Sequence, residues 1–401
     1  MFIRNKTILL FFSYISFVNS IIEIPLKSIQ VKGVLKYDKF KIPEPADDFS
    51  NENNFDNPIY IEQGNSIVNT DELFIATVKI GSNQQPFNFL LDTGSLIAWV
   101  PKTGSADKYK KQNHYEPSSS TTSLKTNYQF SIQYGSGSCS GFYFYDNFNY
   151  INNRNFRFLF GVAFKTNFGV QGADGIIGLA HFYPNEELSF IHMLNKGGVT
   201  QSKIFSLKFG NDIKAGKLGK LIIGKHSDFS QSTTVTSPLV KATGNNQLFW
   251  ICQINSLGIK NSYGLVTSSR TFNIIFDTGT NCILLPLQYY YDLSKNINKI
   301  NCFFATNQDH NLYQLVCQNI KDLPDFRFEI NGNILIVPKI YTFFKAKDGL
   351  FYSKVLFVEN EVYIIGSPFF FAFHTLFDRD SEKLHFYPEN AAYVEKIRNL
   401  R

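Results

Sequence analysis

Two short segments of the sequence carry an aspartate in a setting suited to acid–base chemistry. Asp92 begins the segment Asp-Thr-Gly-Ser and Asp277 begins the segment Asp-Thr-Gly-Thr, and each follows a run of apolar residues. In both copies a proline, Pro101 or Pro286, lies nine residues after the aspartate. Asp, Thr and Gly also form ordinary turns, so a single segment of this kind would indicate little. Two copies in matched surroundings indicate a shared chemical role.

The two segments belong to an internal repeat. The apolar segment Gly175–Gly178 ends 86 residues after Asp92, and the segment Ile364–Gly366 ends 89 residues after Asp277. A structural unit that occurs twice leaves this kind of matched spacing in a sequence. We therefore expect two lobes related by an approximate two-fold axis, with one aspartate from each lobe at their junction.

Such a pair of aspartates would work as one unit. Two carboxylates that face each other closely cannot both ionise cheaply, so they share a proton. One then acts as general base on a water molecule, while the other donates a proton to the carbonyl group under attack. Glycine lets the backbone approach the carboxylates, and the following hydroxyl side chain can hydrogen-bond them. The residues expected to support Asp92 and Asp277 are Thr93, Gly94, Ser95, Thr278, Gly279 and Thr280.

Short strands punctuated by Gly, Asn and Ser must position these segments. The chain has 41 Phe and 21 Tyr but only 2 Met, an aromatic bias that favours sheets over helices. Residues 189–195 and 287–295 are the best helix candidates. The expected strands are Phe74–Ile80, Phe87–Leu91, Phe142–Tyr145, Arg157–Phe164, Lys220–Ile223, Leu248–Ile254, Asp325–Ile330 and Asn333–Val337. The sequence therefore predicts a mostly-β fold.

The N-terminal residues are typical of removable segments. Arg4 and Lys6 precede the apolar run 8–18, as in a signal peptide, and a short membrane anchor is the alternative. An apolar run of 11 residues is too short to span about 30 Å of hydrocarbon. We expect a signal peptide at 1–20, a prosegment at 21–64, an N-terminal lobe at 65–230 and a C-terminal lobe at 231–401. The mature protein would enter the secretory pathway without a stable membrane anchor, and would be secreted, vacuolar or held in a secretory organelle.

Five cysteines in that compartment suggest disulfides, with at least one thiol left over. Cys302 and Cys317 flank a polar loop and form the expected pair, although two neighbouring free thiols are the alternative. Cys139, Cys252 and Cys282 lie in apolar, strand-like runs, and we expect them to be small buried hydrophobes.

The charge pattern argues against a nucleic-acid partner. The formal net charge is +6, but the surplus is scattered and no run of five basic residues occurs. Seven histidines are dispersed without a metal-ligand pair, so we expect neither a metal nor another cofactor. A chain of 401 residues is long enough for two lobes with sizeable cores.

These motifs together resemble the pepsin family of aspartic endopeptidases. Asp92–Ser95 with Trp99–Pro101 is similar to the first catalytic segment of the family, Asp277–Thr280 to the second, and Tyr134–Gly137 to the flap. The resemblance implies a two-lobed fold with pseudo-two-fold symmetry and an active-site cleft between the lobes. It also implies that the flap tyrosine hydrogen-bonds the indole and that the flap contacts the substrate backbone. The residues concerned are Trp99, Tyr134, Gly135 and Ser136.

The composition, rich in Phe, Asn and Lys, is reminiscent of plasmepsin-like enzymes of parasitic protists. Residues 21–60 hold five Lys against seven acids, whereas pepsinogen-like prosegments are basic. The distant partner that the family provides for the cysteine at Cys317 is missing, which supports Cys302 as a local partner. We expect a monomeric aspartic endopeptidase that is made as a zymogen and cleaves proteins or peptides. The alternative is a catalytically inactive binding protein of the same fold, although neither Asp-Thr-Gly segment nor the flap tyrosine is damaged.

Overall fold

The computed structural model of the protein describes residues 59–62, 73–107, 113–134, 137–151, 154–168, 172–183, 185–209, 219–224, 229, 233–241, 248–307, 312–346, 348–359, 363–389 and 393–396. They divide into two compact units, the first with the residues up to Lys203 and 244–248, the second with residues 204–243 and 249–401. The predicted signal peptide lies outside the described residues. Of the predicted prosegment, the structure describes only strand β1 (Ile59–Glu62).

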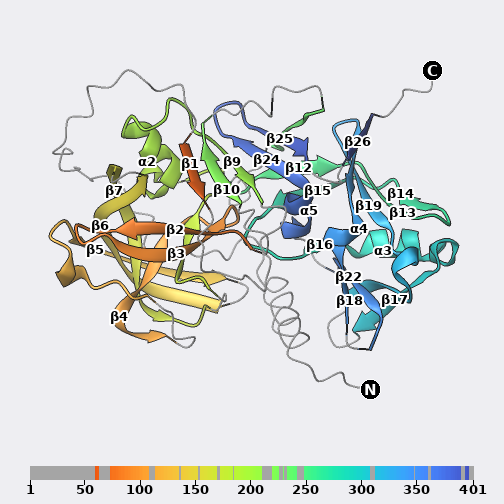
Figure 1. The fold of residues 1–401 in the computed structure, drawn as a ribbon, viewed down its shortest axis with the longest axis horizontal. Helices are drawn as coiled ribbons and strands as arrows, with labels where there is room; N and C mark the ends of the chain where they lie inside the picture. The colour runs from red at the N-terminus through yellow and green to blue at the C-terminus, as the bar shows by residue number, and fades with distance from the viewer. Residues whose placement is uncertain are drawn as a thin grey trace. The chain divides into compact units, whose positions relative to one another are not determined.

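A mixed sheet forms the frame of the first unit (Figure 1). Its strands in chain order are β2 (Ile75–Ile80), β3 (Gln85–Asp92), β4 (Trp99–Asp107), β5 (Leu124–Tyr134), β6 (Gly137–Ile151), β7 (Arg154–Thr166) and β8 (Gly175–Gly178). Within the sheet they follow the order β2-β3-β8-β4-β7-β6-β5. Strand β8 is parallel to β3 and antiparallel to β4, and β5 and β6 form a long antiparallel hairpin.

The second unit repeats this sheet. Its strands are β12 (Ile251–Ile254), β15 (Phe272–Phe276), β16 (Ile283–Pro286), β17 (Cys302–Asn307), β18 (Leu312–Cys317), β22 (Phe351–Val358) and β23 (Ile364–Ile365). They follow the order β12-β15-β23-β16-β22-β18-β17, and β21 (Phe343–Lys345) also pairs with β22. Here β23 is parallel to β15 and antiparallel to β16, as β8 is to β3 and β4. Hairpin β17–β18 therefore occupies the topological position of hairpin β5–β6.

Two further sheets complete the second unit. One has the order β14-β13-β19-β20-β26, and the other contains the run β10-β9-β24-β25-β11. Their strands are β9 (Ile204–Lys208), β10 (Lys220–Ile223), β11 (Val235–Pro238), β13 (Ser256–Lys260), β14 (Leu265–Ser268), β19 (Asp325–Ile330), β20 (Asn333–Val337), β24 (Phe373–Asp378), β25 (Lys383–Pro388) and β26 (Tyr393–Lys396). Strands β10, β19 and β20 have the bounds predicted from the sequence. The described structure thus confirms a mostly-β, two-lobed fold in which the sequence repeat is a repeat of sheet topology.

Interlocking aromatic rings fill the core of each unit. In the first, the ring of Phe148 on β6 lies edge-on to Phe158 and Phe160 on β7, with centroid distances of 5.0 and 5.1 Å. In the second, the ring of Phe276 packs 5.4 Å from Phe369 and 5.2 Å from Phe386. Large rings that alternate along strands bury much apolar area per residue, which is how this Phe-rich composition is used.

The helices are short. Helix α2 (Phe190–Lys196) and helix α3 (Leu287–Ser294) confirm the two that the sequence predicts, and the hydroxyl of Ser189 caps α2 by accepting from the N–H of His192. Helix α4 (Lys339–Thr342) and helix α5 (Ser367–Ala372) were not predicted. Among the helices that the structure describes, none is long and apolar enough to cross a membrane.

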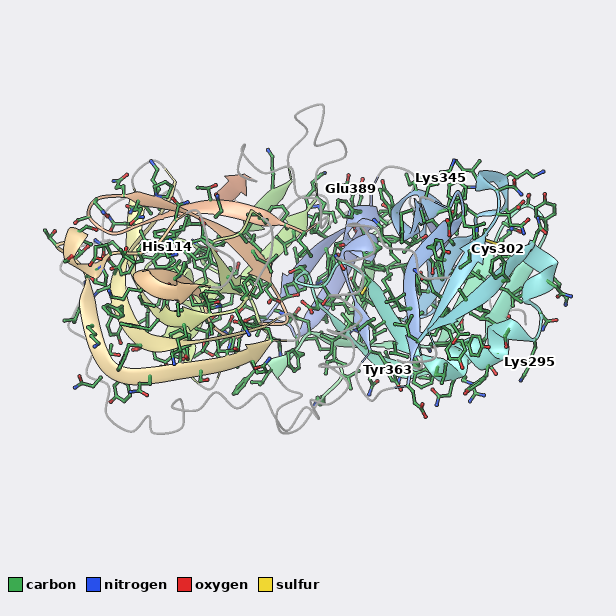
Figure 2. All side chains as sticks on the ribbon, turned by 90° about the horizontal axis from the view of Figure 1, so that it is seen from below. His114, Lys295, Cys302, Lys345, Tyr363 and Glu389 are labelled. Carbon is green, nitrogen blue, oxygen red and sulfur yellow. A yellow bond between two sulfur atoms is a disulfide. The ribbon has the colours of Figure 1, made fainter. Side chains whose placement is uncertain are left out.

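The prediction of a polar loop between Cys302 and Cys317 is wrong, because most of that segment forms hairpin β17–β18. The two cysteines are register partners at its open end and are joined by a disulfide, as predicted (Figure 2 labels Cys302). Polar residues such as Thr306 and Gln314 are typical of a loop, but here they lie on paired strands, where Thr306 is opposite Tyr313 and Gln314 is opposite Ala305. The three other cysteines are free and buried, as expected.

Candidate active site

The first Asp-Thr-Gly segment lies at the end of a buried strand. Asp92 is the last residue of β3, and its register partner on the parallel strand β8 is Gly178. The backbone N–H of Gly94 donates a hydrogen bond to Asp92 Oδ1 at 2.8 Å, and the N–H of Ser95 donates to the Asp92 carbonyl at 3.2 Å. The loop therefore turns around its own carboxylate and holds that carboxylate in one orientation.

The second segment has the same local geometry. The N–H of Asp277, just after β15, donates to the carbonyl of Ile365 on the parallel strand β23. The N–H of Gly279 donates to Asp277 Oδ1 at 2.8 Å, and Thr280 Oγ1 donates to Asp277 Oδ2 at 2.7 Å. Both oxygens of this carboxylate thus accept a hydrogen bond from within the loop.

The glycine of each apolar-apolar-Gly segment lies against the backbone of the neighbouring Asp-Thr-Gly loop. A Cβ on Gly178 would lie 2.6 Å from the carbonyl oxygen of Ser95. A Cβ on Gly366 would lie 2.4 Å from the carbonyl oxygen of Thr280 and 2.1 Å from that of Cys282. No side chain fits at such distances. The glycine in each apolar-apolar-Gly segment is therefore required, because only a residue without a Cβ allows the loop backbone to approach so closely.

The residues that follow each aspartate are buried. Thr93 and Thr278 have no exposed surface, and Ser95 and Thr280 are 4% and 2% exposed. Neighbouring backbone adds further support, because the N–H of Leu179 donates to the Asp92 carbonyl at 2.8 Å. Each carboxylate therefore stands on a loop that the surrounding packing holds in place.

Tyr134, the tyrosine predicted to lie on a flap, is the last described residue of β5 before the turn. Its hydroxyl oxygen accepts a hydrogen bond from Trp99 Nε1 at 3.0 Å and shares another with Ser95 Oγ at 3.2 Å. Burial of the hydroxyl, reinforced by the nearby Cys139, raises the pKa of Tyr134 well above its usual value, so the group keeps its proton. Gly135 and Ser136, the other predicted flap residues, lie outside the described residues.

The thiol of Cys282 interacts electrostatically with the Asp277 carboxylate but stays protonated. Burial, reinforced by the charge of Asp277, raises the pKa of Cys282 to about 12. The reactive form of cysteine is the thiolate, so this side chain stays an inert apolar group beside the loop.

The sequence did not reveal the residues that pack against Tyr134 and hydrogen-bond the backbone around it. Asn167 hydrogen-bonds Ser138 at the start of β6, and the ring of Phe168 packs 5.6 Å from the ring of Tyr134. Gln133 Nε2 donates to the carbonyls of Tyr134 and Gly137 on either side of the turn. An asparagine and a phenylalanine after a strand carry no motif, so only the fold brings them to this position.

Comparisons with known proteins agree with the fold and with the paired loops. Residues 73–388 match the family model described as eukaryotic aspartyl protease. The chain is 26% identical over 329 residues to gastricsin from Oryctolagus cuniculus, covering 79% of this chain and 81% of the relative. It is 28% identical over 341 residues to pepsin A from Gallus gallus, covering 79% and 84%. It is also 28% identical over 379 residues to pepsin II-2/3 from Oryctolagus cuniculus, covering 89% and 91%.

The chain therefore belongs to the eukaryotic aspartyl protease family. It is a pepsin-like enzyme that hydrolyses peptide bonds. Its substrates are peptides, as the chemistry of the family requires.

Proposed function

We propose that Asp92 and Asp277 act together as the catalytic pair of this endopeptidase. The observation that supports the proposal is the repeated geometry of their loops. In both, the N–H of the glycine two residues later (Gly94 or Gly279) donates to Oδ1 at 2.8 Å, and the loop lies against a glycine at the end of a parallel strand, Gly178 as the last residue of β8 or Gly366 just after β23. Because the two loops have the same geometry and follow equivalent strands, we infer that their two carboxylates act in one reaction.

The proposed reaction uses one ionised and one protonated carboxylate. The ionised aspartate takes a proton from a water molecule, whose oxygen attacks the carbonyl carbon, while the protonated aspartate gives its proton to the carbonyl oxygen. The resulting tetrahedral intermediate breaks at its C–N bond when the leaving nitrogen takes up the first proton. The aspartate that was protonated at the start takes a proton back from a hydroxyl of the intermediate as the carbonyl re-forms. The pair thereby returns to its starting state, and the products are a new carboxyl end and a new amino end.

The other predicted residues have supporting roles in this proposal. Thr280 Oγ1 orients Asp277 through its 2.7 Å hydrogen bond. Because Trp99 Nε1 already donates to the Tyr134 oxygen, the Tyr134 O–H is available to donate to Ser95 Oγ. The hydrogen of Ser95 is then available for the Asp92 carboxylate. Extended peptides with apolar side chains on both sides of the cleaved bond are the proposed substrates.

The proposal also includes the biosynthetic history of the enzyme. We infer entry into the secretory pathway through residues 1–20 and synthesis as an inactive zymogen whose prosegment is residues 21–64. These inferences depend on the basic and apolar start of the chain and on the acidic, Asn-rich texture that follows.

The test is the isosteric replacement of each aspartate. Asp92→Asn and Asp277→Asn keep an oxygen that can accept from Gly94 or Gly279, so both variants should fold with unchanged circular dichroism. Each should lower kcat on an internally quenched apolar peptide to below about a hundredth of the wild-type value, because the pair works as a unit. Asp292→Asn, on α3 beside Arg270, is the matched control and should keep activity within about twofold. A folded Asp92 or Asp277 variant with activity like that of the control would refute the proposal.

A further inference from the structure

We propose that Asn167 is a positioning residue that fixes Tyr134 over the first catalytic loop. This inference rests on the proposed function, because Tyr134 matters only if the Asp92 loop takes part in catalysis. Asn167 directly follows β7 and is exposed. Its role follows from three sets of contacts within the first unit.

The first set ties Asn167 to the residue after the turn of hairpin β5–β6. The N–H of Ser138 and the Ser138 hydroxyl both donate to Asn167 Oδ1, the hydroxyl at 3.1 Å. The N–H of Asn167 in turn donates to the Ser138 carbonyl at 3.0 Å. Three hydrogen bonds between two residues exceed what one register position of an antiparallel ladder provides.

The second set extends this attachment to the register partner of Tyr134. Tyr134 and Gly137 are opposite one another at the end of the hairpin. Gly137 has φ +150°, and a Cβ there would lie 2.7 Å from the Asn167 carbonyl oxygen and 2.8 Å from Asn167 Oδ1. Asn167 therefore fills the space beside Gly137, the register partner of Tyr134, and leaves no room for a side chain at position 137.

The third set fixes the ring of Tyr134. Phe168, the residue after Asn167, is 2% exposed, and its ring lies 5.6 Å from the ring of Tyr134 and 5.6 Å from that of Trp99. The chain that anchors the backbone opposite Tyr134 thus also supports the tyrosine ring and the indole that bonds its hydroxyl.

These contacts link Asn167 to the catalytic loop in a short chain. Asn167 holds Ser138 and Gly137, these hold the hairpin end, and Tyr134 at that end bonds Ser95, three residues after Asp92. Asn167 itself touches none of the loop residues named here. Its loss leaves Tyr134 with fewer constraints, so the productive hydrogen bonds form in a smaller fraction of molecules, and misplacement of such groups lowers the rate of the chemical step.

Asn167→Ala is the variant that tests the inference. We expect kcat per active site, counted with a tight-binding inhibitor, to fall about tenfold, while KM changes less than about threefold. Asn167→Asp keeps an oxygen that accepts from the N–H and hydroxyl of Ser138, and should restore kcat to within about threefold of the wild type. Asn83→Ala is the matched control, because Asn83 is another exposed asparagine, bonded to Ser119, and it should leave kcat unchanged.

A double-mutant cycle separates positioning from general destabilisation. If Asn167 acts through the Tyr134 hydroxyl, then Asn167→Ala should cost little further activity in a Tyr134→Phe background. An equal tenfold loss in both backgrounds, or an unchanged kcat in Asn167→Ala alone, would overturn the inference. Either outcome, combined with inactive Asp92→Asn and Asp277→Asn variants, would leave the proposed catalytic pair standing, so the two proposals fail separately.

Discussion

Gly366 offers the sharpest test of how the second catalytic loop is held. The substitution Gly366→Ala adds one Cβ, which would lie 2.1 Å from the Cys282 oxygen and 2.4 Å from the Thr280 oxygen. Real Cβ atoms essentially never come closer than 3.0 Å to such a neighbour, so backbone on one side must move by at least roughly 0.9 Å. The same backbone carries the 2.7 Å hydrogen bond from the N–H of Ser367 to the Thr280 carbonyl. We expect a loss of about 3 kcal/mol or more in the free energy of unfolding.

The assay follows the second unit alone. The chain has two tryptophans, so a Trp99→Phe background leaves the buried Trp250 of the second unit as the only tryptophan reporter. A loss of about 3 kcal/mol should lower the urea midpoint of its fluorescence transition by about 1 to 1.5 M. Activity is measured separately with Trp99 intact, and should fall because displacement of Thr280 disturbs its hydrogen bond to Asp277.

Gly258→Ala provides the matched control. A Cβ there would meet its nearest neighbours, on Arg327 and Thr267, at 3.4 Å, which is ordinary contact in the same unit. We expect its unfolding free energy to change by less than about 1 kcal/mol. Equal midpoints for the two alanine variants would show that the loop backbone yields easily, and the argument for a rigid support of Asp277 would be refuted.

Two further predictions concern stability. Replacing both Cys302 and Cys317 by Ala removes a bridge with a sequence separation of 15, which should cost about 3 kcal/mol and lower the melting temperature; an unchanged temperature would contradict this. Burial raises the pKa of Asp378, but the His385 ring, 3.8 Å away, and two hydrogen bonds from Ser381 outweigh it and hold that pKa at about 2. This value lies below the usual unfolded one of about 3.9, so the carboxylate stabilises the native state above pH 4 and loses that effect as the pH falls towards 2. Asp378→Asn should therefore unfold at lower urea than the wild type at pH 6, with the gap closing near pH 2; a gap that stays constant would refute the assignment.

Much of the candidate site was predictable because it depends on local patterns. An apolar run that ends in Asp-Thr-Gly places its aspartate at a strand end, and Asp92 and Asp277 lie where that pattern puts them. The partner glycines were also found, since Gly178 and Gly366 recur at matched distances along the chain. A repeat in sequence is a strong signal because each copy supports the interpretation of the other.

The remainder depends on contacts between distant segments, which no local pattern encodes. Hairpin β17–β18 is not predictable from the segment itself, because polar residues such as Thr306 and Gln314 interrupt its apolar runs and the pairing of its two strands leaves no local pattern. Helix α5 is not predicted by the sequence, because a mostly apolar segment of six residues is too short to show a helical period. Asn167 acquires its role only because β7 ends beside the turn of another hairpin, 29 residues away from Ser138.

The two equivalent hairpins differ in the kind of bond that secures them. In the second unit, the open end of β17–β18 is closed by a covalent link between Cys302 and Cys317. In the first, the end of β5–β6 that carries Tyr134 is secured by hydrogen bonds and ring contacts, each of which breaks and re-forms in far less than a second. The covalent link lies at the open end of β17–β18 and the reversible contacts lie at the turn end of β5–β6, so the two hairpins are fixed at opposite ends. The contacts at the Tyr134 end can therefore break and re-form within one turnover, whereas the Cys302–Cys317 bond cannot.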